Sequence, residues 1–395
     1  MNHSGKSVRR YDYYGFLRLL MCVMTGVAHY YVLVGFPGGI TVENLPSLGG
    51  NMLERFTYGF VSVATNYGGE FPICFFVLSG FLMHAGYHER IREGKIKFGS
   101  YIARRMVRLF PLLIFSIFVW SVGQWMYFYM HRGWWTGRPA SLWHVAAALT
   151  GIGEGTFMNI HDTVNGPIWY ISVLMICYVV YYLLSRIYNR FLAYGKKIGI
   201  AENAMSYVLF AIPVSVGFAS YTYGLYLPFI NVITAVGYIG FFIGVLTSIL
   251  AYGGVSGKQA AVAGGALFFY AALFAIYGST GYKEIMGPVN YFLGMIFFPA
   301  VIFVIEYLAK RFYGLFHNDF MDVFGKLSFP LYLLQMPVYL WGCFFWELHH
   351  EGEIPPIKFV YAMIAGCFGV SVLWCMIEGR IKLVFEKMIS RMIWN

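Results

Sequence analysis

Charged residues are scarce in this sequence. Asp, Glu, Lys and Arg together make up 12% of its 395 residues, against about 25% in a typical soluble domain. A soluble protein of this length would lack the charge to cover its surface, and the mean hydropathy of +0.63 agrees. The composition excludes a disordered chain and predicts a protein of several membrane-spanning helices.

Cysteine is scarce as well, and the six that are present lie in apolar stretches without a CxxC pair. This pattern is typical of small buried residues and not of a disulfide framework or a zinc site. His349 and His350 stand in an acidic loop that we interpret as solvated, so we predict no metal centre. The net charge of +10 indicates basic cytoplasmic loops and not a nucleic-acid partner.

Long apolar segments run through the whole chain. A membrane-spanning helix needs about 20 mostly apolar residues. We therefore expect an all-α polytopic protein of about ten transmembrane helices, forming a single transmembrane domain over residues 1–395 without a fused soluble domain. The ten expected spans are 13–34, 61–86, 105–129, 166–188, 205–222, 228–251, 259–278, 288–309, 327–346 and 357–378.

The basic residues predict how these spans are oriented. With both termini in the cytoplasm, all but five of the 28 Lys and Arg residues fall on the cytoplasmic side, which is the bias that membrane proteins show. We accordingly expect a multi-pass protein of the plasma membrane. The longest segment between spans, about 130–165, is rich in Trp and is expected to hold a short interfacial helix.

Two ionisable residues stand inside the first expected span. Arg18 and His29 are separated by 11 residues, which places them about 20° apart around a helix and about 16 Å apart along it. Both therefore face one side, Arg18 near the cytoplasmic end and His29 beyond the midplane. Glu70, at the outer part of the next span, stands at a similar depth and is a candidate to orient His29. The alternatives are a snorkelling Arg18, a packed His29 and a solvated Glu70.

Arginines also gather where the third expected span begins. Arg105 and Arg108 are spaced i, i+3 and share a helix face. Guanidinium groups bind phosphate oxygens in a bidentate manner, so this face is a candidate phosphate site. The alternative is a cluster that anchors the helix to lipid headgroups.

Later spans carry polar and aromatic residues. Asn165 begins a turn before the fourth span, and Trp169 and Tyr170 follow it at the expected outer interface, as an aromatic belt or as a platform for a sugar ring. Gln335 is a polar residue inside an apolar helix and requires a partner on another helix or on a ligand.

Taken together and in this order, these segments resemble the integral-membrane acyltransferases of the acyltransferase-3 type, which O-acylate cell-surface polysaccharides and related acceptors. The resemblance covers nearly the whole chain. The matching motifs are Arg18-x10-His29, Phe75–Leu82, Tyr101–Pro111, Asn165–Ser172 and Ser328–Pro337. Family members often have an acidic residue where Gly15 and Ile73 stand, and His where Gln335 stands.

The resemblance implies an acetyl-CoA-dependent O-acetyltransferase with acyl-CoA as co-substrate and no permanently bound cofactor. Arg18, Arg105 and Arg108 would bind acyl-CoA from the cytoplasm. His29 would act as general base or as a transient acyl carrier. The acceptor would be a hydroxyl of an extracytoplasmic saccharide or glycan, bound by Asn165, Trp169, Tyr170 and Gln335. The other partners expected are membrane lipids.

Two other functions fit the same composition. A transporter or flippase for a lipid-linked glycan would also need charges inside about ten helices, although we find no inverted repeat. A catalytically inactive sensor or scaffold would share the motifs without turnover. Thioester turnover distinguishes the enzyme from both.

Overall fold

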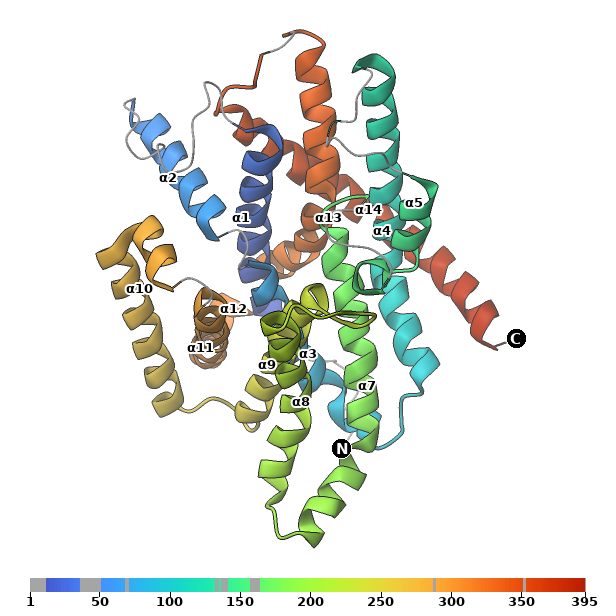
Figure 1. Cartoon of the computed structure of the whole chain (residues 1–395), viewed down its shortest axis with the longest axis vertical. Helices are drawn as coiled ribbons and strands as arrows, with labels where there is room; N and C mark the ends of the chain where they lie inside the picture. The colour runs from blue at the N-terminus through green and yellow to red at the C-terminus, as the bar shows by residue number, and fades with distance from the viewer. Residues whose placement is uncertain are drawn as a thin grey trace.

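The computed structural model of the chain describes residues 12–35, 51–67, 71–131, 135, 141–156, 164–286, 289–350 and 353–394. These residues form an all-α membrane protein whose only described strands are the two short ones of a hairpin, β1 (Tyr226–Leu227) and β2 (Ile230–Asn231) (Figure 1). The helices are η1 (Asp12–Tyr14), α1 (Gly15–Val34), α2 (Met52–Tyr67), α3 (Phe71–Arg92), α4 (Phe98–His131), α5 (Leu142–Leu149), α6 (Gly153–Thr156), α7 (Ile168–Lys197), α8 (Glu202–Thr222), α9 (Val232–Leu250), α10 (Gly257–Met286), α11 (Val289–Arg311), α12 (Tyr313–Phe316), α13 (Asp319–Glu347) and α14 (Phe359–Trp394).

The observed helices follow the expected spans closely. Within the described residues, eight helices are long and apolar enough to cross a membrane, namely α1, α3, α4, α7, α8, α9, α13 and α14. The two other expected spans coincide with α10 and α11. The count of ten spans and the cytoplasmic position of both termini stay predictions. The short helix expected within 130–165 is present as α5, which Ser141 caps by accepting from the His144 amide.

One expected span differs from the structure. Residues 61–86 were predicted as a single helix, but the structure has two, because α2 ends at Tyr67 and α3 begins at Phe71. Pro72 is the second residue of α3, where its missing N–H removes no helical hydrogen bond. Hydropathy alone does not predict this break between α2 and α3, because apolar residues lie on both sides of it.

Glycines let the central helices approach closely. A Cβ on Gly80 of α3 would collide with the Phe241 carbonyl of α9, and one on Gly244 of α9 would collide with the Val77 carbonyl of α3. The two backbones are therefore in direct contact, as small residues permit in membrane helix packing. This contact fixes α3, which lies beside α7 and α1.

The contact of α1 with α13 is of the same kind. A Cβ on Gly15 would lie 2.7 Å from the Gly325 amide nitrogen and closer still to the Met321 carbonyl oxygen. Farther along α1, a Cβ on Gly26 would lie 2.9 Å from Oε1 of Gln335. The two helices are thus packed along most of α1, with the Arg18 and His29 side of α1 turned to α13.

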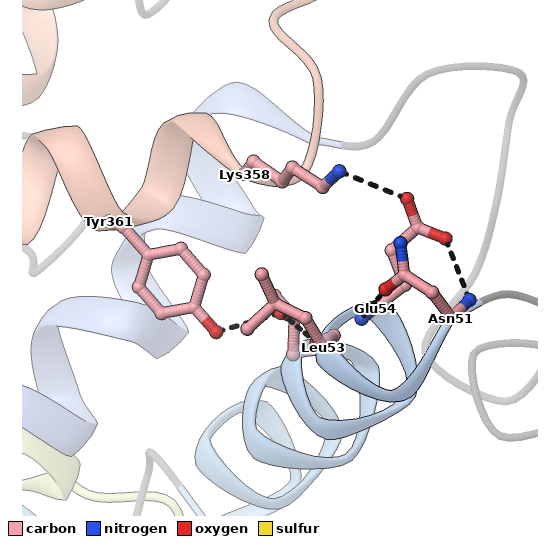
Figure 2. Close-up of polar contacts among 6 residues, drawn as sticks. Asn51, Leu53, Glu54, Lys358 and Tyr361 are labelled. Atoms are coloured by element: carbon pink, nitrogen blue, oxygen red, sulfur yellow. Dashed lines mark hydrogen bonds and ion pairs between the residues drawn. The ribbon is translucent and has the colours of Figure 1, made fainter.

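Polar contacts join α2 to the start of α14 (Figure 2). Glu54 lies 3.1 Å from the Lys358 ammonium, and the Thr57 and Tyr361 hydroxyls are 2.7 Å apart. Asn51 and Glu54 also exchange backbone-to-side-chain hydrogen bonds at the first turn of α2. The hydrogen bond and charge of Lys358 hold the pKa of the Glu54 carboxyl below its usual range, so this carboxylate stays ionised at neutral pH.

The packing of α3 against α9 predicts opposite effects for two glycines of α3. Gly80→Ala inserts a methyl group against a backbone carbonyl and should cost about 1–3 kcal/mol of stability. Gly86→Ala is the matched control, since a Cβ there meets nothing within 4 Å and improves helix propensity by about 1 kcal/mol. Thermal unfolding in detergent should show a lower midpoint for the first variant only. Equal midpoints for the two variants would contradict this packing.

Candidate active site

A cavity of about 170 Å³ lies among α1, α3, α4, α7 and α13. Arg18, Arg105 and Arg108, the three arginines that the sequence analysis singled out, all line it. They lie where α1 and α4 begin. We call this end of the bundle the basic end, and define it by Arg18, Arg104, Arg105 and Arg108. The structure therefore brings the predicted phosphate-binding residues to one place.

The arginines reach the cavity from two helices, α4 and α1. Arg105 and Arg108 reach the cavity from one face of α4, as their spacing predicts. Arg104 is exposed, and its Nε donates instead to the Ser100 carbonyl at 3.0 Å. On α1, the Arg18 guanidinium lies 3.0 Å from the point where a Cβ on Gly325 would stand. The missing side chain of Gly325 therefore leaves the room that Arg18 occupies.

Three tyrosines surround Arg105. Its guanidinium carbon lies 4.2 Å from the ring centre of Tyr87, 5.3 Å from Tyr101 and 5.4 Å from Tyr178, and Nη2 donates to the Met83 sulfur at 3.5 Å. Arg105 is only 6% exposed, and no carboxylate of the described residues forms an ion pair with it. Ring faces attract a cation, but they do not neutralise it. A buried positive charge is therefore available for an anionic ligand.

A second cavity, of about 220 Å³, shares Arg18 and Arg108 with the first. Its lysines are compensated, since Lys326 pairs with Asp322 at 2.6 Å and Lys382 with Glu378 at 2.8 Å. Arg108 is exposed and forms no ion pair within the described part of the chain. The two cavities therefore adjoin at Arg18 and Arg108.

The deep wall of the first cavity is aromatic. The ring centres of Phe75, Tyr170 and Tyr332 lie 5.5–5.9 Å apart, and the hydroxyls of Ser79 and Tyr170 are 3.1 Å apart. Tyr170 was expected at the outer interface, but it is buried and lines the cavity that holds the arginines. The difference arises because α7 begins well inside the bundle, beside the middle of α13.

Asn165 fixes this deep start of α7. Pro337 has no N–H, so the Leu333 carbonyl, four residues earlier in α13, lacks its usual helical partner. The Asn165 Nδ2 donates to that carbonyl at 3.0 Å, and a Cβ on Gly166 would lie 2.5 Å from the Met336 methyl. The buried Oδ1 of Asn165 has no hydrogen-bond partner among the described residues.

His29 lies beyond the deep wall and is not among the residues that line the two cavities. Its polar neighbour is Gln335, with which it interacts, and Gly26 stands one turn before it. The Tyr339 hydroxyl donates to the Gly26 carbonyl at 2.9 Å and holds α1 at this level. Nδ1 of His29 and both amide atoms of Gln335 are buried without a hydrogen bond of good geometry to any described residue.

One turn of α13 contacts the arginine cavity, Asn165 and His29 in succession. Tyr332 lines the arginine cavity, Leu333 accepts from Asn165, and Gln335 contacts His29 and Gly26. Residues spaced i, i+3 share a helix face and differ by about 4.5 Å along the axis. On α13, the residue that contacts His29 therefore lies about one helical turn beyond a residue that lines the arginine cavity.

Two predicted residues remain. Glu70 lies outside the described residues. Trp169 is half-buried, with its ring centre 5.9 Å from Phe76 and 6.5 Å from Tyr170. The sequence analysis missed Tyr87, Tyr101, Tyr178 and Tyr332. Tyr101 precedes Arg105 by one helical turn, which is a signal in the sequence, but the other three come from separate helices.

Comparison with known protein families identifies the family of this chain. The sequence model of a protein family, described as an acyltransferase domain of the acyltransferase-3 type, matches residues 72–376. The match includes Arg105, Arg108, Asn165, Tyr170 and Gln335, while Arg18 and His29 precede it. No curated protein and no solved structure matches the chain.

The contact between Asn165 and the Leu333 carbonyl predicts a dependence on Pro337. Asn165→Ala leaves a buried carbonyl unpaired and should cost about 1–3 kcal/mol. In a Pro337→Ala background the helix supplies its own N–H, so the same change should cost less than half as much. Unfolding by titration with a denaturing detergent measures both costs. An equal cost in the two backgrounds would show that Pro337 does not create the need for Asn165.

Proposed function

The chain belongs to the acyltransferase-3 family and is a multi-pass membrane acyltransferase, and from this we propose which groups it transfers. The donor is acyl-CoA, with acetyl as the acyl group, bound at the basic end. The acceptor is a hydroxyl of a saccharide or glycan on the other side of the membrane. The membrane is the plasma membrane, with the basic end in the cytoplasm.

The buried charge of Arg105 is the observation that carries the donor proposal. An uncompensated guanidinium is costly in a membrane protein unless a ligand neutralises it. Coenzyme A supplies phosphates, which arginine binds in a bidentate manner. The exposed Arg108 at the junction of the two cavities meets the phosphates first, and Arg18 contributes a third positive charge.

The aromatic deep wall supports a donor that is long and uncharged beyond its phosphates. The pantetheine arm carries the thioester away from the arginines and toward Phe75, Tyr170 and Tyr332. This wall excludes water from the thioester, which protects it from hydrolysis. Tyr170 then contributes to the donor cavity in addition to the acceptor contact that the resemblance implies.

His29 serves as the general base for the acceptor hydroxyl. The hydroxyl oxygen attacks the thioester carbonyl carbon, its proton passes to His29, and the coenzyme A thiolate leaves and takes up a proton. Gln335 orients the imidazole from α13, at the position where the resemblance implies a histidine in many family members. The unpartnered Oδ1 of Asn165 and the half-buried ring of Trp169 are the contacts that we assign to the acceptor.

The arginine assignment predicts a loss of donor affinity. Arg105→Gln and Arg108→Gln each remove a charge-assisted contact of about 1.5–3 kcal/mol, so the dissociation constant of acetyl-CoA should rise about 10- to 100-fold. Arg104→Gln is the matched control, because Arg104 is exposed and bonds its own helix. Calorimetric titration in lipid nanodiscs compares the three. Equal affinities for all three variants would exclude this cavity as the donor site.

The His29 assignment predicts binding without turnover. Loss of a general base lowers the rate about 10²- to 10⁴-fold, whereas the affinity for acetyl-CoA should change by no more than about threefold. Acetyl-CoA hydrolysis by purified His29→Ala measures this, with His349→Ala in the exposed outer loop as control. Full hydrolysis by His29→Ala would remove His29 from the mechanism.

A further inference from the structure

Tyr332 lines the arginine cavity, and its buried hydroxyl has no hydrogen-bond partner in the part of the chain that the structure describes. Tyr332 is 3% exposed and lines the cavity from α13. Its hydroxyl oxygen has no hydrogen-bond partner among the described residues. A buried polar group without a partner costs about 1–3 kcal/mol, so it is rare unless it serves a ligand.

The polar groups beside Tyr332 already have partners of their own. The neighbouring Tyr170 hydroxyl lies 3.1 Å from the Ser79 hydroxyl, and the Cys22 thiol donates to the Ser328 carbonyl at 2.9 Å. Tyr332 lies beside both Tyr170 and Cys22. Among these three residues that line the cavity, Tyr332 alone has a hydrogen-bond donor without a partner among the described residues.

Its position along α13 lies between the arginines and His29. Gly325, beside the Arg18 guanidinium, precedes Tyr332 by seven residues, or about 10 Å of helix rise. Gln335, which contacts His29, follows Tyr332 by one turn. A ligand that binds its phosphates at the arginines and extends inward therefore reaches Tyr332 before it reaches His29.

We propose that Tyr332 is a catalytic residue that donates a hydrogen bond to the carbonyl oxygen of the donor thioester. This inference rests on the proposed function. As the acceptor oxygen forms its bond to the carbonyl carbon, the carbonyl electron pair moves to that oxygen, and the Tyr332 hydroxyl stabilises the negative charge. When the pair returns, the carbon–sulfur bond breaks and the thiolate leaves with its electrons. The proton held by His29 then passes to the thiolate.

The phenol suits this role. With an ordinary pKa near 10, a tyrosine hydroxyl keeps its proton at neutral pH and is a donor. A donor that faces developing charge in a site without water stabilises the transition state more than the ground state. Removal of one such donor typically lowers the rate about 10²- to 10³-fold.

Tyr332→Phe tests the role without changing the ring packing. We expect acetyl-CoA hydrolysis to fall about 10²-fold in kcat, with the dissociation constant of acetyl-CoA within about threefold of the parent. Tyr238→Phe is the matched control, because Tyr238 is also buried but its hydroxyl donates to the Phe229 carbonyl, away from the cavity. This control should retain the turnover of the parent.

Infrared spectroscopy of a bound, non-hydrolysable ketone analogue of acetyl-CoA, ¹³C-labelled at the carbonyl, gives a second readout. The carbonyl band should lie at lower wavenumber in the parent than in Tyr332→Phe, because the hydrogen bond weakens the carbonyl bond. Full turnover by Tyr332→Phe, or an unchanged carbonyl band, would overturn the proposal while the proposed function stands. If the parent itself neither binds nor hydrolyses acetyl-CoA, both the proposed function and this role of Tyr332 are wrong.

Discussion

The close packing of α1 against α13 is the constraint on which the rest of the site depends. At the basic end it needs Gly15 and Gly325, because a Cβ on Gly15 would collide with the α13 backbone. Farther along, it needs Gly26, which leaves room for Gln335. The first contact places Arg18 against α13, and the second places His29 beside Gln335. Glycine at position 15 is thus required for a reason of space.

Pro337 allows α13 to hold the start of α7. In a helix without proline, the Leu333 carbonyl would accept a hydrogen bond from the amide of residue 337. Pro337 has no N–H, and the Asn165 side chain donates to this carbonyl instead. That bond holds the start of α7 deep in the bundle, so Tyr170 lines the arginine cavity and does not belong to an outer belt. Along α13, the carbonyl that Asn165 holds therefore comes directly after Tyr332, which lines the arginine cavity.

The sequence predicts the all-α class and most span positions because hydropathy is a local property. It also predicts the shared face of Arg105 and Arg108, since both stand on one helix. It does not predict the break between α2 and α3, which hydropathy does not register, or the depth of Tyr170, which depends on a hydrogen bond between two helices. The tyrosines around Arg105 come from α3, α4 and α7, so no spacing in the sequence places them together.

The most direct test is a structure, by electron cryo-microscopy in nanodiscs, of the protein with a non-hydrolysable ketone analogue of acetyl-CoA. The account predicts phosphate density against Arg105 and Arg108, with the carbonyl oxygen within hydrogen-bond distance of the Tyr332 hydroxyl and next to His29. Density for the analogue at the opposite end of the bundle, or outside the arginine cavity, would contradict it.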